Sequence, residues 1–149
     1  MPPKASHKLG FPVFAVAFAP GNPVVLVGGG GGPNNSGVKN SLIAYTVNET
    51  TLELIPLAEH QFSKQEDACM SLAVHPKEKT FVAGVNCSAE DVKTGENLNC
   101  RVLYMAAEKF SQNRAYKTIG GGQESTDYQK TARFSPDGKF LLTGATDGM

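Results

Sequence analysis

The chain has 149 residues, of which 40% are apolar and 19% are charged, a composition typical of one globular domain. Basic and acidic residues both number 14, and no basic run or basic patch with interleaved aromatic residues occurs, so nucleic acid is not an expected partner. No stretch approaches the roughly 18 apolar residues of a transmembrane helix, so we expect no membrane insertion by this segment.

The first predicted strands recur along the chain as a repeated unit. Each unit has an alternating apolar strand that ends near a proline, and a second apolar run followed by a glycine eight residues after that proline. Proline cannot donate to a central ladder and therefore ends the first strand, while the β-rich run after it suits a second strand. The three prolines are Pro20, Pro76 and Pro136, and the matching glycines are Gly28, Gly84 and Gly144.

Two further strands are predicted in each of the first two units. They cover residues 41–47 and 51–57 in the first unit, and residues 101–105 and 115–119 in the second. Four antiparallel strands per unit, repeated, is the layout of a β-propeller blade. The sequence therefore predicts an all-β fold, a partial β-propeller of about two and a half blades in one domain over 1–149. Blade 1 covers about 10–62, blade 2 about 68–119, and the start of blade 3 about 128–149.

A partial ring has a physical consequence. Each blade buries its faces against neighbouring blades, so a stable propeller needs several of them. About two and a half blades cannot close a ring, and they leave apolar faces and strand edges open. We therefore expect this chain to be the N-terminal part of a longer protein and to aggregate when isolated.

The segment 28–40, GGGGGPNNSGVKN, connects two predicted strands and is too long for a tight hairpin turn. Ordering each glycine costs ~1–2 kcal/mol of backbone entropy. An ordered loop therefore needs a compensating contact, either an ion held by backbone carbonyls or a partner protein; the other interpretation is a mobile, solvated loop. Carbonyl rings replace the hydration shell of potassium, and residues 28–37 contain no carboxylate, which disfavours a divalent ion.

The same loop does not fit a nucleotide-binding motif. Gly32 and Gly37 have the spacing of a phosphate-binding loop, but Lys39 falls one residue late. A strand is predicted after it, so no helix N-terminus is available for phosphates.

Histidines and cysteines give no catalytic pattern either. The sequence indicates no acid–base pair for catalysis. His75 is predicted to be a turn residue. The cysteines lack the spacing of a zinc site, so free thiols are expected. The residues concerned are His7, His60, His75, Cys69, Cys87 and Cys100.

Residues 10–47 resemble a known family. The loop sequence GGGGGPNNSGVKN is followed by Ser41-Leu42 and preceded by GFPVF at 10–14 and VVLV at 24–27. This pattern resembles the start of the endoplasmic-reticulum guanine-nucleotide exchange factors for the Sar-type small GTPase, called prolactin regulatory element-binding proteins in mammals, which start COPII vesicle budding. The resemblance implies a seven-bladed WD-repeat-like propeller without obvious WD dipeptides. It also implies a location at the cytosolic face of the endoplasmic reticulum membrane, with a membrane anchor downstream of this segment.

The resemblance also implies site residues. Asn40 matches an asparagine needed for exchange, and Val38, Lys39 and Asn40 would contact the GTPase. The loop would press against the switch regions and speed GDP release without a covalent step. The competing interpretation is a non-catalytic interaction scaffold, because propellers host many functions. The potassium ion would be held by Gly28, Gly29, Gly30, Gly31, Gly32, Asn34, Asn35 and Gly37.

Overall fold

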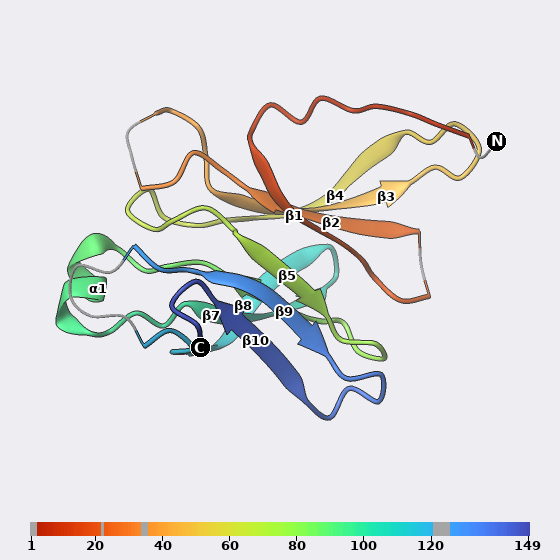
Figure 1. Ribbon diagram of the computed structural model, residues 1–149. Helices are drawn as coiled ribbons and strands as arrows, with labels where there is room; N and C mark the ends of the chain where they lie inside the picture. Colours follow the sequence, from red (N-terminus) through yellow and green to blue (C-terminus); the bar gives the residue numbers. More distant parts are fainter. Residues whose placement is uncertain (1–2, 22, 34–35, 121–125) are drawn as a thin grey trace.

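A computed structural model describes residues 3–21, 23–33, 36–120 and 126–149, and within them the fold consists of antiparallel sheets, as the sequence predicts (Figure 1). The strands of each sheet follow one another in sequence order. The first sheet contains β1 (Val13–Phe18), β2 (Val24–Gly29), β3 (Ser41–Val47) and β4 (Leu54–Gln61). The second contains β5 (Ser71–Val74), β6 (Thr80–Gly84), β7 (Cys100–Ala106) and β8 (Lys109–Tyr116), and the third contains β9 (Gln129–Phe134) and β10 (Leu141–Ala145).

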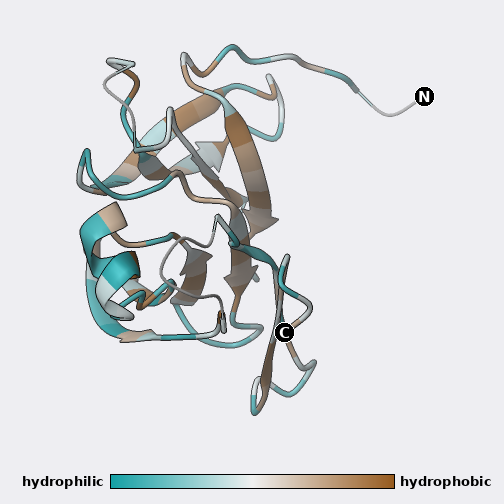
Figure 2. Ribbon diagram, turned by 60° about the vertical axis from the view of Figure 1, so that its left-hand side comes forward, coloured by the Kyte–Doolittle hydropathy of each residue, from teal (hydrophilic) through white to brown (hydrophobic). Residues whose placement is uncertain are grey.

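The three sheets are arranged side by side like neighbouring blades. Strand β1 lies beside β5, and β5 lies beside β9, so the first strand of every sheet lies on the same side of the assembly. Strands β4 and β8 also contact each other. Hydropathy differs between the elements: inner strands such as β2 are hydrophobic, whereas the short helix α1 (Ala89–Thr94) is mainly hydrophilic (Figure 2).

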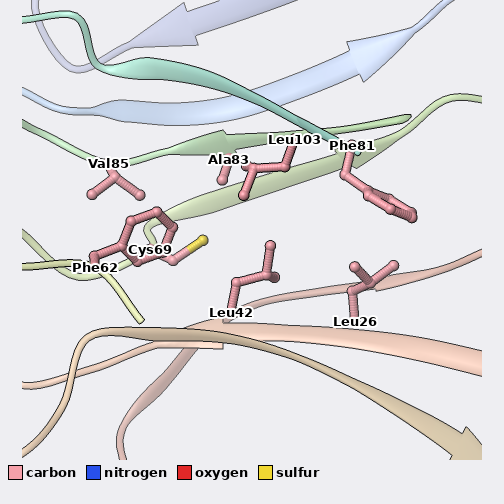
Figure 3. Packing of buried hydrophobic residues seen from close by; sticks show 8 residues of the cluster. All are labelled: Leu26, Leu42, Phe62, Cys69, Phe81, Ala83, Val85 and Leu103. Atoms are coloured by element: carbon pink, nitrogen blue, oxygen red, sulfur yellow. The ribbon is translucent and has the colours of Figure 1, made fainter. Parts of the chain in front are cut away.

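The main core lies between the first and second sheets (Figure 3). Leu26 and Leu42 from the first sheet face Phe81 and Leu103 from the second, and all four are almost completely buried. Cys69, in the connection between the sheets, fills the space beside them, and burial raises its pKa to about 12. Its thiol therefore stays protonated and packs as a small apolar group. All three cysteines are free, as predicted.

Polar contacts join the second sheet to the third. His75 Nδ1 accepts hydrogen bonds from the backbone N–H groups of Lys77 and Glu78, so Nε2 carries the proton and donates to the Gly138 carbonyl at 3.1 Å. Gln129 is fully buried, and its amide donates to Ser71 Oγ at 3.0 Å. His75 is thus a turn residue, as expected, and it also holds the β9–β10 hairpin.

Several element boundaries differ from the sequence predictions. Strand β2 continues through Gly29, because Gly28 and Gly29 pair with residues of β3 in the ladder. Strand β4 begins three residues later than predicted, after a turn in which Leu52 has a φ of 61°. Helix α1 was not predicted, although Ser88 caps its N-terminus by accepting from the Asp91 N–H and Gly95 ends it with a φ of 84°.

Strand β8 begins at Lys109 rather than near residue 115, because β7 and β8 form a two-residue hairpin. Ala107 and Glu108 occupy the turn with φ values of 47° and 59°. Both central residues of a type I′ turn need positive φ, and Asn-Gly is the usual signal. The sequence lacks that signal here, so the hairpin could not be recognised from it.

This turn gives a stability prediction. Glu108→Gly should raise the free energy of unfolding by about 0.5–1 kcal/mol, because relief of the left-handed strain exceeds the extra chain entropy of glycine. Urea unfolding followed by circular dichroism measures the change. Lys109→Gly is the matched control, since Lys109 belongs to β8 and has no positive φ, and it should be destabilising. Equal effects of the two substitutions would contradict the turn assignment.

Apolar side chains are exposed at two edges of the assembly. Phe14, Val16 and Phe18 on β1, together with Phe140 and Leu142 at β10, are at least half exposed. These are the faces that neighbouring blades cover in a propeller. No helix within the described residues is long and apolar enough to cross a membrane.

Candidate functional site

The loop between β2 and β3 begins at Gly30, two residues later than the sequence indicates. Gly28 and Gly29 belong to β2 and pair with Leu42 and Ser41, so they are ladder residues rather than loop residues. Residues 30–33 and 36–40 are the described part of this loop, which we call the glycine loop. Of the predicted potassium ligands, Gly30, Gly31, Gly32 and Gly37 lie in it, and Asn34 and Asn35 lie outside the described residues.

Asn40 holds the two arms of the glycine loop together. Its side-chain oxygen accepts from the Gly32 N–H at 2.9 Å, and its amide donates to the Gly32 carbonyl at 3.1 Å. The second amide hydrogen goes to the Glu66 carbonyl at 2.8 Å. Asn40 is only 3% exposed. Both of its amide hydrogens are therefore used inside the protein, and Asn40 fixes the loop rather than projecting from it.

At two positions of the loop, contacts with Asn40 require glycine. Gly30 has a φ of 144°, and a Cβ there would overlap the Asn40 side chain. Gly32 has a φ of 78°, which places its N–H and carbonyl on Asn40. Hydrogen bonds within the chain therefore explain why Gly30 and Gly32 are ordered. These hydrogen bonds could not be inferred from the sequence.

The loop is tied to the second sheet through the connection at 63–70. The Asp67 N–H donates to the Asn86 carbonyl at 3.0 Å. The Arg101 guanidinium on β7 forms an ion pair with Glu66 at 2.7 Å, with only 10% and 20% of the two side chains exposed. The glycine loop, this connection and α1 consequently gather at one end of the sheets, which we call the loop face (Figure 1).

A hollow of about 350 Å³ lies against the glycine loop. Val38 and Lys39 line it from the loop, and Gln61 and Lys64 line it from the end of β4 and the following turn. Lys39 is exposed, whereas Asn40 is buried and does not project from the loop. The hollow's Gln61 and Lys64 and the Glu66–Arg101 pair were not foreseen. No local motif marks them, because Gln61 and Lys64 meet the glycine loop, and Glu66 meets Arg101, only through contacts between distant parts of the sequence.

A second buried asparagine occupies the matching place in blade 2. Asn40 directly precedes β3, the third strand of its sheet, and Asn99 directly precedes β7, the third strand of the next. Asn99 is fully buried, and its side chain accepts from the Thr118 N–H and donates to Thr118 Oγ1. The buried asparagine is thus a repeated feature of the blades, and what differs is the glycine loop that Asn40 holds.

The loop face contains one half-buried histidine with a predicted pH effect. His60 packs edge-on against Phe62 at 4.8 Å, and its pKa is lowered by burial, with Glu66 opposing and Arg101 reinforcing the shift. A lowered pKa means that the unfolded chain binds the proton more readily. Stability should therefore be constant above about pH 6.5, the unfolded value, and decrease as the pH falls toward the folded pKa. Urea midpoints between pH 5 and 8 measure this, and His60→Gln should flatten the profile; an unchanged profile would contradict the assignment.

The geometry can be compared with known proteins. Residues 122–149, which include β9 and β10, match the family model described as WD domain, G-beta repeat. Three solved structures share the arrangement of sheets at low sequence identity. A chain of the mitotic checkpoint complex has a TM-score of 0.62 and 16% identity, with 91% of this chain and 34% of that chain covered.

Two further structures agree. Sqt1 from Chaetomium thermophilum, bound to the N-terminus of ribosomal protein L10, has a TM-score of 0.58 and 21% identity, with 91% of this chain and 29% of that chain covered. The WD40 repeats of RRP9 have a TM-score of 0.55 and 12% identity, with coverages of 89% and 34%. The fold is that of a partial WD40 propeller. The predicted fold class is confirmed, and the chain spans about a third of the length of these WD40 propellers.

Proposed function

We propose that this chain is the part of a WD40 propeller that carries a docking face for a Sar-type small GTPase, and that it promotes GDP release without a covalent step. The observation that supports this proposal is the glycine loop, which Asn40 holds rigidly at the loop face. A loop that is already ordered loses little entropy on binding, which raises its affinity for a partner. The loop sequence resembles that of the exchange factors at the same place.

In this proposal the residues have different tasks. Val38 and Lys39 contact the GTPase, because they line the hollow at the surface. Asn40 is a positioning residue, since its amide is occupied by Gly32 and Glu66. Exchange follows if the loop binds the nucleotide-free GTPase more tightly than the GDP-bound form. The proposed place of action is the cytosolic face of the endoplasmic reticulum membrane, at the start of COPII vesicle budding.

A potassium ion is proposed for the same loop. The backbone carbonyls of Gly30, Gly31, Gly32 and Gly37 are the donor type that potassium prefers, and no carboxylate occurs in this stretch. Gly28 and Gly29 are less suitable, because they lie in the β2–β3 ladder. A bound ion would add to the order that Asn40 already gives. Thermal unfolding in potassium, sodium and lithium chloride tests this, and a melting temperature that does not depend on the cation would exclude the ion.

A second candidate function is a non-catalytic interaction scaffold. The burial of Asn40 favours it, because a residue that only holds a loop is compatible with simple binding. Release of a fluorescent GDP analogue from the GTPase separates the two functions. An exchange factor should accelerate release in proportion to its concentration, whereas a scaffold should bind the GTPase and leave the release rate unchanged. No binding at all would exclude both functions for this partner.

A further inference from the structure

The hollow beside the glycine loop contains two cations that lack acidic partners. Lys39 lines it from the loop and Lys64 from the turn after β4. Within the described part of the chain, neither ammonium group forms an ion pair, and no carboxylate lines the hollow. The two lysines therefore make a local positive site on a chain whose net charge is zero.

The acidic side chain nearest to Lys64 in the sequence is engaged elsewhere. Glu66 lies only two residues after Lys64, but its carboxylate pairs with Arg101 at 2.7 Å and accepts from the Ser63 N–H at 2.8 Å. The Glu66 N–H also donates to the Ser63 carbonyl at 3.3 Å, so the turn that carries Lys64 is closed. Lys39 is fixed in turn by its neighbour Asn40. Both lysines thus extend from ordered backbone.

A second hollow of about 660 Å³ has the opposite charge. It is lined by Glu66 of the same turn and by Glu90 and Asp91 of α1, with Pro33 of the glycine loop also in its lining. No lysine or arginine lines it. Because Glu66 is paired with Arg101, Glu90 and Asp91 supply the unpaired acidic groups of this hollow among the described residues; they disfavour an acidic group of a partner, which the two lysines of the first hollow favour.

We propose that the hollow lined by Lys39 and Lys64 binds the carboxylate of an aspartate or glutamate on the surface of the partner protein. This inference rests on the proposed function and adds the chemistry of the contact. The Gln61 amide supplies a neutral donor beside the two charges, and Val38 and Phe62 supply an apolar wall for the methylene groups of the incoming side chain. No arginine lines the hollow, so the two ammonium groups and the Gln61 amide make the polar contacts, and the aspartates and glutamates of a protein surface supply the carboxylate.

The test uses the double variant Lys39→Ala/Lys64→Ala and two probes. The first probe is the Sar-type GTPase in its nucleotide-free form, with the dissociation constant measured at low and high salt. The second is acetylated tetraglutamate, followed by changes in the amide NMR signals of Gln61 and Lys64. Loss of both lysines should weaken each affinity by about tenfold at low salt. Lys77→Ala is the matched control, because this exposed lysine lies in the β5–β6 turn, at the opposite end of the strands.

The outcomes distinguish failure of the carboxylate site from failure of the proposed exchange function. If the double variant binds the GTPase and speeds GDP release as well as the wild type, the carboxylate site is wrong and the exchange function stands. If tetraglutamate binds through the two lysines but the GTPase does not bind, the site stands and the exchange function is wrong. Binding of inorganic phosphate more tightly than tetraglutamate, or failure of tetraglutamate to bind, would overturn the proposal.

Discussion

Asn40→Ala should reduce the acceleration of GDP release by at least about tenfold while the propeller blades remain folded. The substitution leaves the N–H and carbonyl of Gly32 and the carbonyl of Glu66 without the hydrogen bonds that Asn40 provides. Each unsatisfied, partly buried group costs about 1–3 kcal/mol. The loop avoids this cost by moving into water, and it then loses the fixed shape that docking requires. Stopped-flow release of a fluorescent GDP analogue measures the rate, and circular dichroism checks the fold.

Asn99→Ala is the control for this experiment. Asn99 occupies the same place before the third strand of its sheet and is equally buried, but it bonds to Thr118 rather than to the glycine loop. Its loss should destabilise blade 2 by a similar amount and leave the exchange rate nearly unchanged. A similar fall in exchange for both variants would mean that general destabilisation, and not the glycine loop, explains the effect. Full activity of Asn40→Ala would remove the loop from the mechanism.

The strand pattern could be predicted from the sequence because its signals are local. Alternating apolar residues before Pro20, Pro76 and Pro136 fix the first strand of each sheet, and the runs after them fix the second. The β7–β8 hairpin escaped prediction because Ala107 and Glu108 adopt positive φ without glycine or asparagine. Helix α1 could have been recognised from the Ser88–Asp91 capping pattern and Gly95, but its six residues are too few for a clear helical period.

The site could be predicted only in part. The glycine run drew attention to this loop, and the residue at its end, Asn40, forms the hydrogen bonds that hold the loop. Its role was expected to be direct contact with a partner, whereas its side chain is buried. Burial and hydrogen-bond partners depend on Glu66, which is 26 residues away in sequence. Lys64 and Arg101 join the same region through similarly distant contacts, and a single sequence carries no signal for such pairs.

The buried ion pair between Glu66 and Arg101 should show unequal effects of its two partners. Glu66→Ala leaves the guanidinium of Arg101 without its carboxylate at a position where only 10% of the side chain is exposed. Removal of one partner from a buried pair costs about 3–5 kcal/mol. Arg101→Met leaves Glu66 behind, which is twice as exposed and can be rehydrated more easily. Arg101→Met also removes the buried Nε, which has no hydrogen-bond partner within the described residues. We therefore expect Arg101→Met to cost about half as much as Glu66→Ala.

The double variant Glu66→Ala/Arg101→Met shows whether the stability loss comes from the uncompensated charge of Arg101 or from lost packing. If the uncompensated guanidinium causes most of the loss, the double variant should be more stable than Glu66→Ala alone, because the charge that was stranded is gone. If packing dominates, the two losses should add. Urea unfolding of all four proteins measures the coupling. The exchange rate should fall in both single variants, because the Glu66 backbone carbonyl receives the Asn40 amide, and movement of this connection releases the glycine loop.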